Sequence, residues 1–112
     1  MAADPVHVIV STAEFHTKLQ EAISSNQLIV VDFTATWCGP CKMMAPIFLD
    51  LSKKYLNVIF LKVDVDQLAD ITNQWGVSAM PTFVFILDGK PIDKVVGANK
   101  VELDRKIAKY AQ

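Results

Sequence analysis

Two cysteines three residues apart are the residues of this chain best suited to chemistry. Cys38 and Cys41 lie in the sequence WCGPCK, residues 37–42, and the chain contains 2 cysteines in all. A disulfide between them would close a very small loop, and in the chain-entropy account such a loop stabilises a fold little. We therefore predict a reactive pair rather than a structural one.

The position of the pair predicts different chemical roles for the two thiols. An apolar strand pattern precedes Cys38 and a helical pattern follows it, so Cys38 is predicted at a helix N-terminus, where unpaired N–H groups and the helix dipole favour an anion. A thiolate there has a lowered pKa, and the thiolate is the form that attacks disulfides. Helix geometry places the two Cα atoms about 5 Å apart, a distance that a disulfide tolerates. Cys38 is predicted to attack a target disulfide. Cys41, pointing further inside with a higher pKa, is predicted to attack the mixed disulfide.

The residues beside the pair have simple expected roles. Gly39 would let another chain approach the backbone closely, and Pro40 suits the first helical turn. Trp37 would offer a flat apolar rim to the nucleophile. Lys42 would help to lower the cysteine pKa, although an ordinary exposed lysine is the alternative.

A lone C-x-x-C is also compatible with half of a zinc site. Zinc takes about four protein ligands in structural sites. The other soft candidates are His7 and His16, which are far away in sequence and not at ligand spacing. We therefore predict no metal.

The surrounding pattern alternates strands and helices. Strands are predicted at residues 7–10, 28–33, 57–63, 82–87 and 92–96. Helices are predicted after Ser11 up to about residues 24–26, and at 38–54, 67–74 and 101–110. Ser11 followed by Glu14 is typical of a capping box, Pro46 predicts a kink, and Asp88-Gly89 predicts a hairpin turn. The order predicts one α/β domain over residues 1–112, with four helices flanking a mixed sheet of about five strands.

Composition excludes several other classes of function. The net charge of −1 gives no electrostatic reason to expect nucleic acid or an anionic membrane as partner. The longest apolar run, residues 83–87, is far shorter than the ~20 residues of a membrane span. Residues 1–5 lack the features of a secretory signal, so we expect a cytoplasmic protein, with a monomer as the default.

Several segments together resemble one family. WCGPCK, VDF at 31–33, Pro46, MPTF at 80–83, Gly89 and Gly97 stand in order at the spacing of the thioredoxin family. The resemblance extends from about His7 to Tyr110 and is closest to cytosolic eukaryotic members, including the plant h-type. It implies the thioredoxin fold, a Cys38–Cys41 disulfide and reduction of disulfides in client proteins. It also implies recharging by an NADPH-dependent thioredoxin reductase, so that NADPH serves indirectly and no cofactor is bound.

The same resemblance implies roles for two charged residues. Asp32 matches the family's buried aspartate; burial would raise its pKa, so that it could accept the proton of Cys41, directly or through water. The residues alone favour the other interpretation, an aspartate at a strand end bonded to backbone N–H groups, and the resemblance reverses that preference. Lys62 stands where some members place a lysine beside that aspartate, although it could equally extend from a strand end into solvent.

A client-binding surface is implied on the other side of the cysteines. Pro81 matches a cis-proline that faces them, which would leave the Met80 backbone free to pair with an extended peptide. A shallow apolar groove would be completed by Ala79, Gly97 and Ala98 together with Trp37 and Pro40. The small residues also suit turns and packing.

Two other functions fit parts of this pattern. A disulfide oxidase or isomerase would normally carry other residues in place of Gly39 and Pro40, and would need an export signal. A binding module would dock to a partner in one redox state without turnover. If the protein is a disulfide reductase, glutathione with glutaredoxin is an alternative electron source to thioredoxin reductase.

Overall fold

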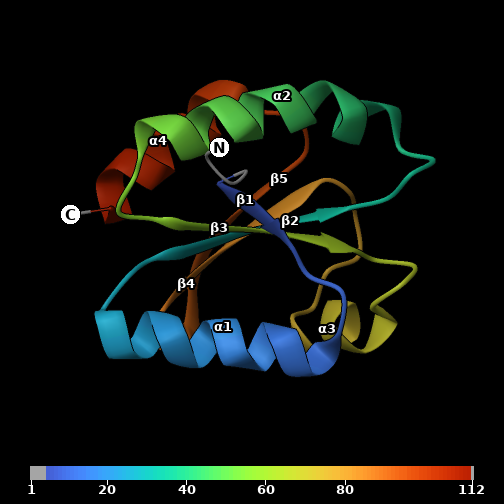
Figure 1. Ribbon diagram of the computed structural model, residues 1–112. Coiled ribbons are helices and arrows are strands. Elements are labelled where there is room, and N and C mark those ends of the chain that lie inside the picture. Colours follow the sequence, from blue (N-terminus) through green and yellow to red (C-terminus); the bar gives the residue numbers. More distant parts are fainter. Residues whose placement is uncertain (1–4, 112) are drawn as a thin grey trace.

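The computed structural model describes residues 5–111. Met1–Asp4, which belong to the segment in which we predicted no secretory signal, lie outside the described residues. Figure 1 shows a central sheet between two layers of helices. In chain order the elements are β1 (Val6–Val8), α1 (Thr12–Ser25), β2 (Ile29–Thr34), α2 (Gly39–Lys54), β3 (Ile59–Asp64), α3 (Ala69–Gln74), β4 (Thr82–Leu87), β5 (Lys90–Val96) and α4 (Lys100–Tyr110).

The sheet is mixed, as predicted. Its order is β1-β3-β2-β4-β5, with β1, β3 and β2 parallel and with β4 and β5 antiparallel to their neighbours. Helices α2 and α4 cover one face, and α1 and α3 cover the other (Figure 1). Because β2 and β4 are antiparallel, the C-terminal end of β2 and the start of β4 lie at the same end of the sheet, and α2 begins close to that end.

The predicted helix cap at Ser11 is present, although the Glu14 carboxylate reaches back to Val10 N–H rather than to the Ser11 N–H of a full capping box. Ser11 accepts a hydrogen bond from Glu14 N–H at 3.1 Å, and the Glu14 carboxylate accepts from Val10 N–H at 2.7 Å. Because Val10 is held by the helix cap, β1 ends at Val8 rather than at the predicted residue 10. The helix ends as expected, with Asn26 in the left-handed conformation.

Other boundaries differ from prediction where turns intervene. The third strand begins at Ile59 rather than at residue 57 because Val58 N–H bonds back to Tyr55 in a turn. Helix α3 begins at Ala69 rather than at residue 67 because the Asp64 carboxylate holds Gln67 N–H at 3.2 Å. The hairpin at 88–89 is tight, with φ of 55° and 77°, so β5 begins two residues earlier than predicted, at residue 90.

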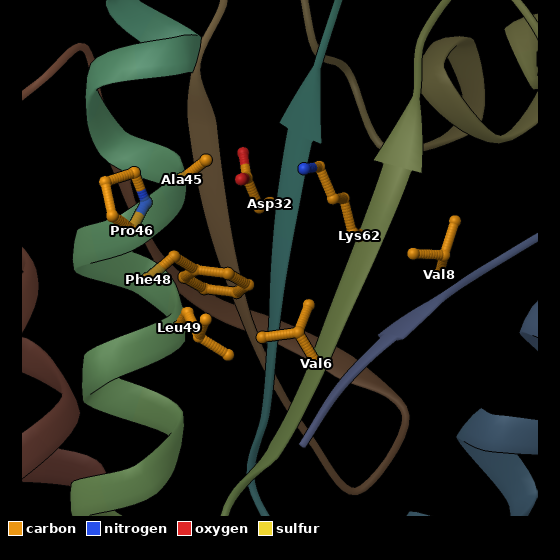
Figure 2. Close-up of a pocket in the computed structure, with 8 residues that line it drawn as sticks. All are labelled: Val6, Val8, Asp32, Ala45, Pro46, Phe48, Leu49 and Lys62. Carbon is orange, nitrogen blue, oxygen red and sulfur yellow. The ribbon is translucent and has the colours of Figure 1, made fainter. Parts of the chain in front are cut away.

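The sheet separates two apolar layers. One lies between the sheet and the helices α1 and α3, and the other between the sheet and α2 and α4. In the second layer, Phe48 points from α2 onto the sheet (Figure 2), where its ring centroid lies 5.2 Å from Phe60 and 5.5 Å from Phe83. Strand β2 is buried from residue 29 to residue 33, as its apolar run predicted. These contacts fix α2, and with it the cysteines, against the sheet.

A carboxylate on β5 ties α4 to the sheet. Asp93 accepts hydrogen bonds from Lys106 Nζ at 2.9 Å, Tyr110 OH at 2.8 Å and Lys94 N–H at 2.7 Å. Partial burial by itself raises the pKa of Asp93, but these bonds outweigh it and lower the pKa to about 2.

Asp93→Asn should therefore lower the free energy of unfolding at pH 7 by about 1–2 kcal/mol, allowing for the partial exposure of the group. A lowered folded-state pKa stabilises the fold above the unfolded value of 3.8, and this stabilisation is lost as pH falls toward 2. The deficit of the variant should accordingly shrink between pH 4 and pH 2 in urea titrations. Asp88→Asn in the exposed turn is the matched control and should change little; an equal loss in both variants would contradict the prediction.

Candidate active site

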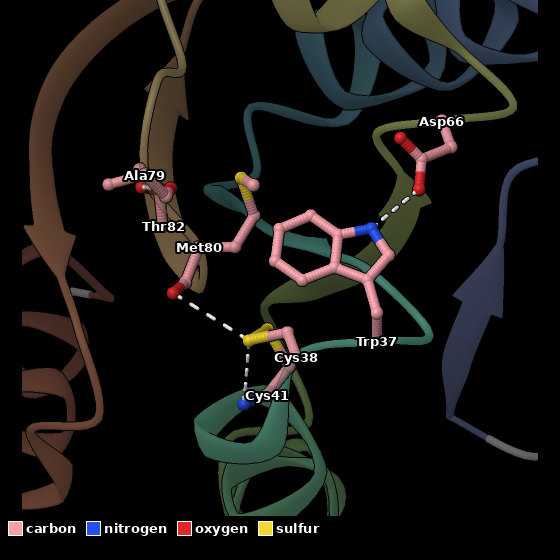
Figure 3. Close-up of a disulfide and its surroundings, with 7 residues drawn as sticks. All are labelled: Trp37, Cys38, Cys41, Asp66, Ala79, Met80 and Thr82. Carbon is pink, nitrogen blue, oxygen red and sulfur yellow. Dashed lines mark hydrogen bonds between the residues drawn. A yellow bond between two sulfur atoms is a disulfide. The ribbon is translucent and has the colours of Figure 1, made fainter.

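Cys38 caps the helix that carries Cys41. The two form a disulfide with a Cα–Cα distance of 5.3 Å, in agreement with the value expected from helix geometry. Cys38 is the N-cap of α2, and the Cys41 N–H points at its sulfur over 3.2 Å (Figure 3). When the pair is reduced, that N–H can donate to a Cys38 thiolate and stabilise it. Local structure alone therefore favours Cys38 as the nucleophile.

The two cysteines differ more in what they face than in how deeply they are buried. The exposed fraction is 5% for Cys38 and 3% for Cys41, so the expected deeper placement of Cys41 is small, because the disulfide draws the sulfurs together. Cys38 Sγ lies 3.7 Å from the carbonyl oxygen of Met80, whereas Cys41 lines a cavity that also includes Ala45 and Lys62. In the oxidised protein neither sulfur carries a proton, so the Met80 contact is not a hydrogen bond.

The predicted client-binding residues gather beside Cys38. The Met80–Pro81 bond is cis, as the resemblance implies. The Pro81 carbonyl accepts from Gly97 N–H at 2.8 Å, which joins the loop before β4 to the end of β5. Trp37, Pro40, Ala79 and Ala98 are exposed, Met80 and Gly97 are half-buried, and Pro81 is buried. The cysteines thus lie beside an accessible surface of mainly apolar and small residues.

Trp37 is held by a residue that sequence reasoning missed. Its indole N–H donates to Asp66 Oδ2 at 2.9 Å, although 65% of Trp37 is exposed. Figure 3 shows the indole between the Met80 side chain and Asp66. The Asp66 loop is itself held by Asp64, whose carboxylate accepts from Asp66 N–H at 2.9 Å. No pattern near Asp66 indicates this contact, because it joins loops 29 residues apart.

Asp32 is buried on β2, the strand that precedes the cysteines. It is 1% exposed, and its Oδ1 has no hydrogen-bond partner among the described residues. Burial raises the pKa of Asp32 to about 7, and the positive charge of Lys62 opposes part of that shift. The alternative of a carboxylate saturated by backbone N–H groups is therefore not what the structure shows. A carboxyl group with this pKa can exchange a proton near neutral pH.

Lys62 is the neighbour of Asp32 in the sheet. The parallel register pairs Asp32 on β2 with Lys62 on β3, and Figure 2 shows the lysine nitrogen pointing toward the carboxylate. Both line a cavity of about 240 Å³ between the sheet and α2. Lys42, by contrast, is exposed on α2, where it lines the second cavity together with Cys41.

The two histidines lie away from the cysteines. His7 on β1 approaches the Glu14 carboxylate at 2.8 Å, and His16 lies on α1. Within residues 5–111 no three side chains of His, Cys, Asp or Glu gather in a way that could hold a metal ion.

Comparison with known proteins identifies this arrangement. The sequence model of the thioredoxin family matches residues 6–109. The chain belongs to the thioredoxin family. A thioredoxin H-type of Picea mariana is 56% identical over 111 residues, which cover 99% of this chain and 89% of the relative. Thioredoxin H1 of Arabidopsis thaliana is 51% identical, with 98% of both chains covered.

Solved structures agree with the thioredoxin assignment. The crystal structure of the thioredoxin NaTrxh from Nicotiana alata superposes with a TM-score of 0.94 at 45% identity, covering 100% of this chain and 97% of that one. The predicted thioredoxin fold and the similarity to plant h-type members are confirmed. With its cysteine pair at the active-site position of the family, the protein is a dithiol–disulfide oxidoreductase. In the described part of the chain, no helix is both long and apolar enough to cross a bilayer.

Proposed function

We propose that the protein reduces disulfides in client proteins, with Cys38 as the attacking thiolate and Cys41 as the resolving thiol. The observation that carries this assignment is the cap of α2, in which Cys38 Sγ lies 3.2 Å from the Cys41 N–H. Backbone donors and the helix dipole stabilise negative charge at this sulfur and not at Cys41, which lies within the helix.

Each turnover moves two electrons from the cysteine pair to the client. The Cys38 thiolate attacks a client sulfur, forms a mixed disulfide and expels one client thiolate, which takes a proton from water. Cys41 then loses its proton to the Asp32 carboxylate, and its thiolate attacks Cys38 Sγ. The second client thiolate leaves, and the Cys38–Cys41 disulfide forms. Asp32 suits the role of proton acceptor because it is buried and its pKa is raised to about 7.

The client is proposed to bind as an extended segment beside Cys38. The Met80 carbonyl, 3.7 Å from Cys38 Sγ, lies where an added strand could use it as an acceptor. Trp37 and Pro40 supply exposed surface on one side of the sulfur, and Ala98 supplies it beyond Gly97. Asp66 acts as a positioning residue, since it orients the Trp37 indole.

We infer that electrons reach the pair from NADPH through a thioredoxin reductase, that the protein is a cytoplasmic monomer, and that it binds no cofactor. Membership of the thioredoxin family and similarity to h-type members support this inference. Glutathione with glutaredoxin is the competing electron source.

Turnover assays test both the activity and its electron source. We expect the wild-type protein to reduce insulin disulfides with NADPH and a plant thioredoxin reductase, at a rate proportional to its concentration. A parallel assay supplies glutathione, glutaredoxin and glutathione reductase; faster turnover there would identify that source instead. A folded protein that is inactive with both donors and with dithiothreitol would contradict the proposed reductase function.

A further inference from the structure

Met43 is a large apolar residue of α2 that takes no part in the core. Its neighbour Met44 is buried in the layer between the sheet and α2, whereas Met43 is 66% exposed. It also lines neither of the cavities beside Asp32 and Cys41. Exposure by itself does not mark a binding site, because single apolar residues are common on protein surfaces. The position of Met43 relative to Cys38 is what gives it a function.

The winding of α2 places Met43 next to the surface proposed to bind clients. With 3.6 residues per turn, Met43 lies on the same side of the helix as Pro40, three residues earlier, and on the opposite side from Ala45. Pro40 is exposed and belongs to the client-binding surface, whereas Ala45 lines the cavity that includes Cys41. The five residues from the N-cap Cys38 to Met43 correspond to about 7.5 Å along the helix axis. Met43 therefore continues the client-binding surface beyond Pro40 by about one helical turn.

A second methionine borders Cys38 from the loop before β4. The carbonyl oxygen of Met80 lies 3.7 Å from Cys38 Sγ, and its side chain lies beside the Trp37 indole (Figure 3). Methionine side chains are unbranched and polarisable, so they adapt to apolar partners of different shapes. A surface with methionines on two separate elements suits apolar side chains of varied shape rather than one fixed ligand.

We propose that Met43 selects clients by contacting an apolar side chain within about two residues of the client cysteine that Cys38 attacks. This inference rests on the proposed function and adds a preference among clients to it. One part of the client segment pairs with the Met80 backbone, and the other part leaves Cys38 past Pro40. Because an extended chain advances about 3.3 Å per residue, it covers the distance of about 7.5 Å to Met43 within about two residues. The partner of Met43 is therefore the flanking segment of the client itself.

Rates of mixed-disulfide formation with activated peptides test the proposal. Short peptides carry a central cysteine joined to thionitrobenzoate through a disulfide, and they differ only in having leucine or serine at one flanking position at a time. In the Cys41→Ser parent, the Cys38 thiolate attacks the peptide sulfur. The bond between that sulfur and thionitrobenzoate breaks, and thionitrobenzoate leaves as a coloured thiolate. Stopped-flow absorbance then gives a second-order rate constant for each peptide.

The ratio of the leucine rate constant to the serine rate constant is the informative quantity. On one flank of the cysteine we expect leucine to react about fivefold faster, the effect of burying part of one apolar side chain. Adding Met43→Ser should abolish this ratio, and Met43→Leu should keep it. Leu56→Ser is the matched control and should also keep it, because Leu56 is 81% exposed just beyond the opposite end of α2. Dividing by the serine rate constant cancels any change in the reactivity of the Cys38 thiolate.

Two patterns of rate constants would overturn the proposal. In one, the ratio is the same in Met43→Ser as in the Cys41→Ser parent, so that other residues select the client. In the other, Leu56→Ser loses the ratio as fully as Met43→Ser, so that the effect does not belong to the surface around Cys38. Failure of the proposed function gives a different result, since the folded parent would then release no thionitrobenzoate from any peptide, and both the function and the role of Met43 would be wrong.

Discussion

Cys41→Ser is expected to accumulate covalent adducts with client proteins, joined through Cys38, while Cys38→Ser accumulates none. The nucleophile stays at the cap of α2 in the first variant, but the resolving thiol is gone, so the mixed disulfide persists. Turnover should fall about 10³-fold or more in either variant, as happens when the nucleophile of a covalent catalyst is removed. Non-reducing electrophoresis and mass spectrometry of the linked peptides measure the adducts.

The double variant Cys38→Ser, Cys41→Ser controls for non-covalent association. It keeps the shape of the surface around Trp37 and Met80 but has no thiol, so it should retain no client after denaturation. Adducts that form in Cys38→Ser through Cys41 would reverse the assigned roles. They would also show that the cap hydrogen bond of 3.2 Å between Cys41 N–H and Cys38 Sγ does not decide reactivity.

Asp32→Asn is expected to stabilise the oxidised protein above pH 7. It is also expected to slow the release of the client from the mixed disulfide. The pKa of Asp32 rises from 3.8 to about 7 on folding because the carboxyl group is buried. The native state therefore binds more protons than the unfolded state between these values, and stability falls as pH rises through that range. Three pKa units correspond to about 4 kcal/mol, an upper bound for the gain of the variant above pH 7, since an amide is also costly to bury.

Urea titrations from pH 4 to pH 9 measure this effect. The wild-type protein should lose stability between about pH 4 and pH 7 and change little above that through this group, and Asp32→Asn should show a much flatter dependence. The same variant should slow release of the client from the mixed disulfide about 100-fold or more, measured by stopped flow, because the amide cannot accept the Cys41 proton. Asp50→Asn, an exposed position on α2, is the control. Parallel pH dependence in wild type and Asp32→Asn would contradict the raised pKa of Asp32.

Local patterns in the chain predicted most of the elements. Strand β4 over residues 82–87, the helix cap at Ser11 and the turn at 88–89 were each anticipated, because hydrogen bonds between near neighbours and the period of apolar residues determine them. The errors lie at ends of elements, such as the start of β3, where a turn within the chain replaces strand pairing. The spacing of the cysteines is local too, and so the 5.3 Å separation followed from helix geometry.

The chemistry around the cysteines depends on contacts between distant segments. Cys38 meets Met80 across 42 residues and Trp37 meets Asp66 across 29, and neither pair has a periodic pattern. The pairing of Asp32 with Lys62 follows from the parallel register of β2 and β3, which a shift of one residue would abolish.

The amino-acid sequence by itself therefore determined the reactive pair, its position at a helix N-terminus and the order of the elements, all of which depend on neighbouring residues. Only the tertiary structure decided that Asp32 is buried with no partner for Oδ1 among the described residues, and that it lines a cavity together with Lys62. Those properties arise where separate strands and a helix meet, and burial at such a place is set by the packing of the whole chain.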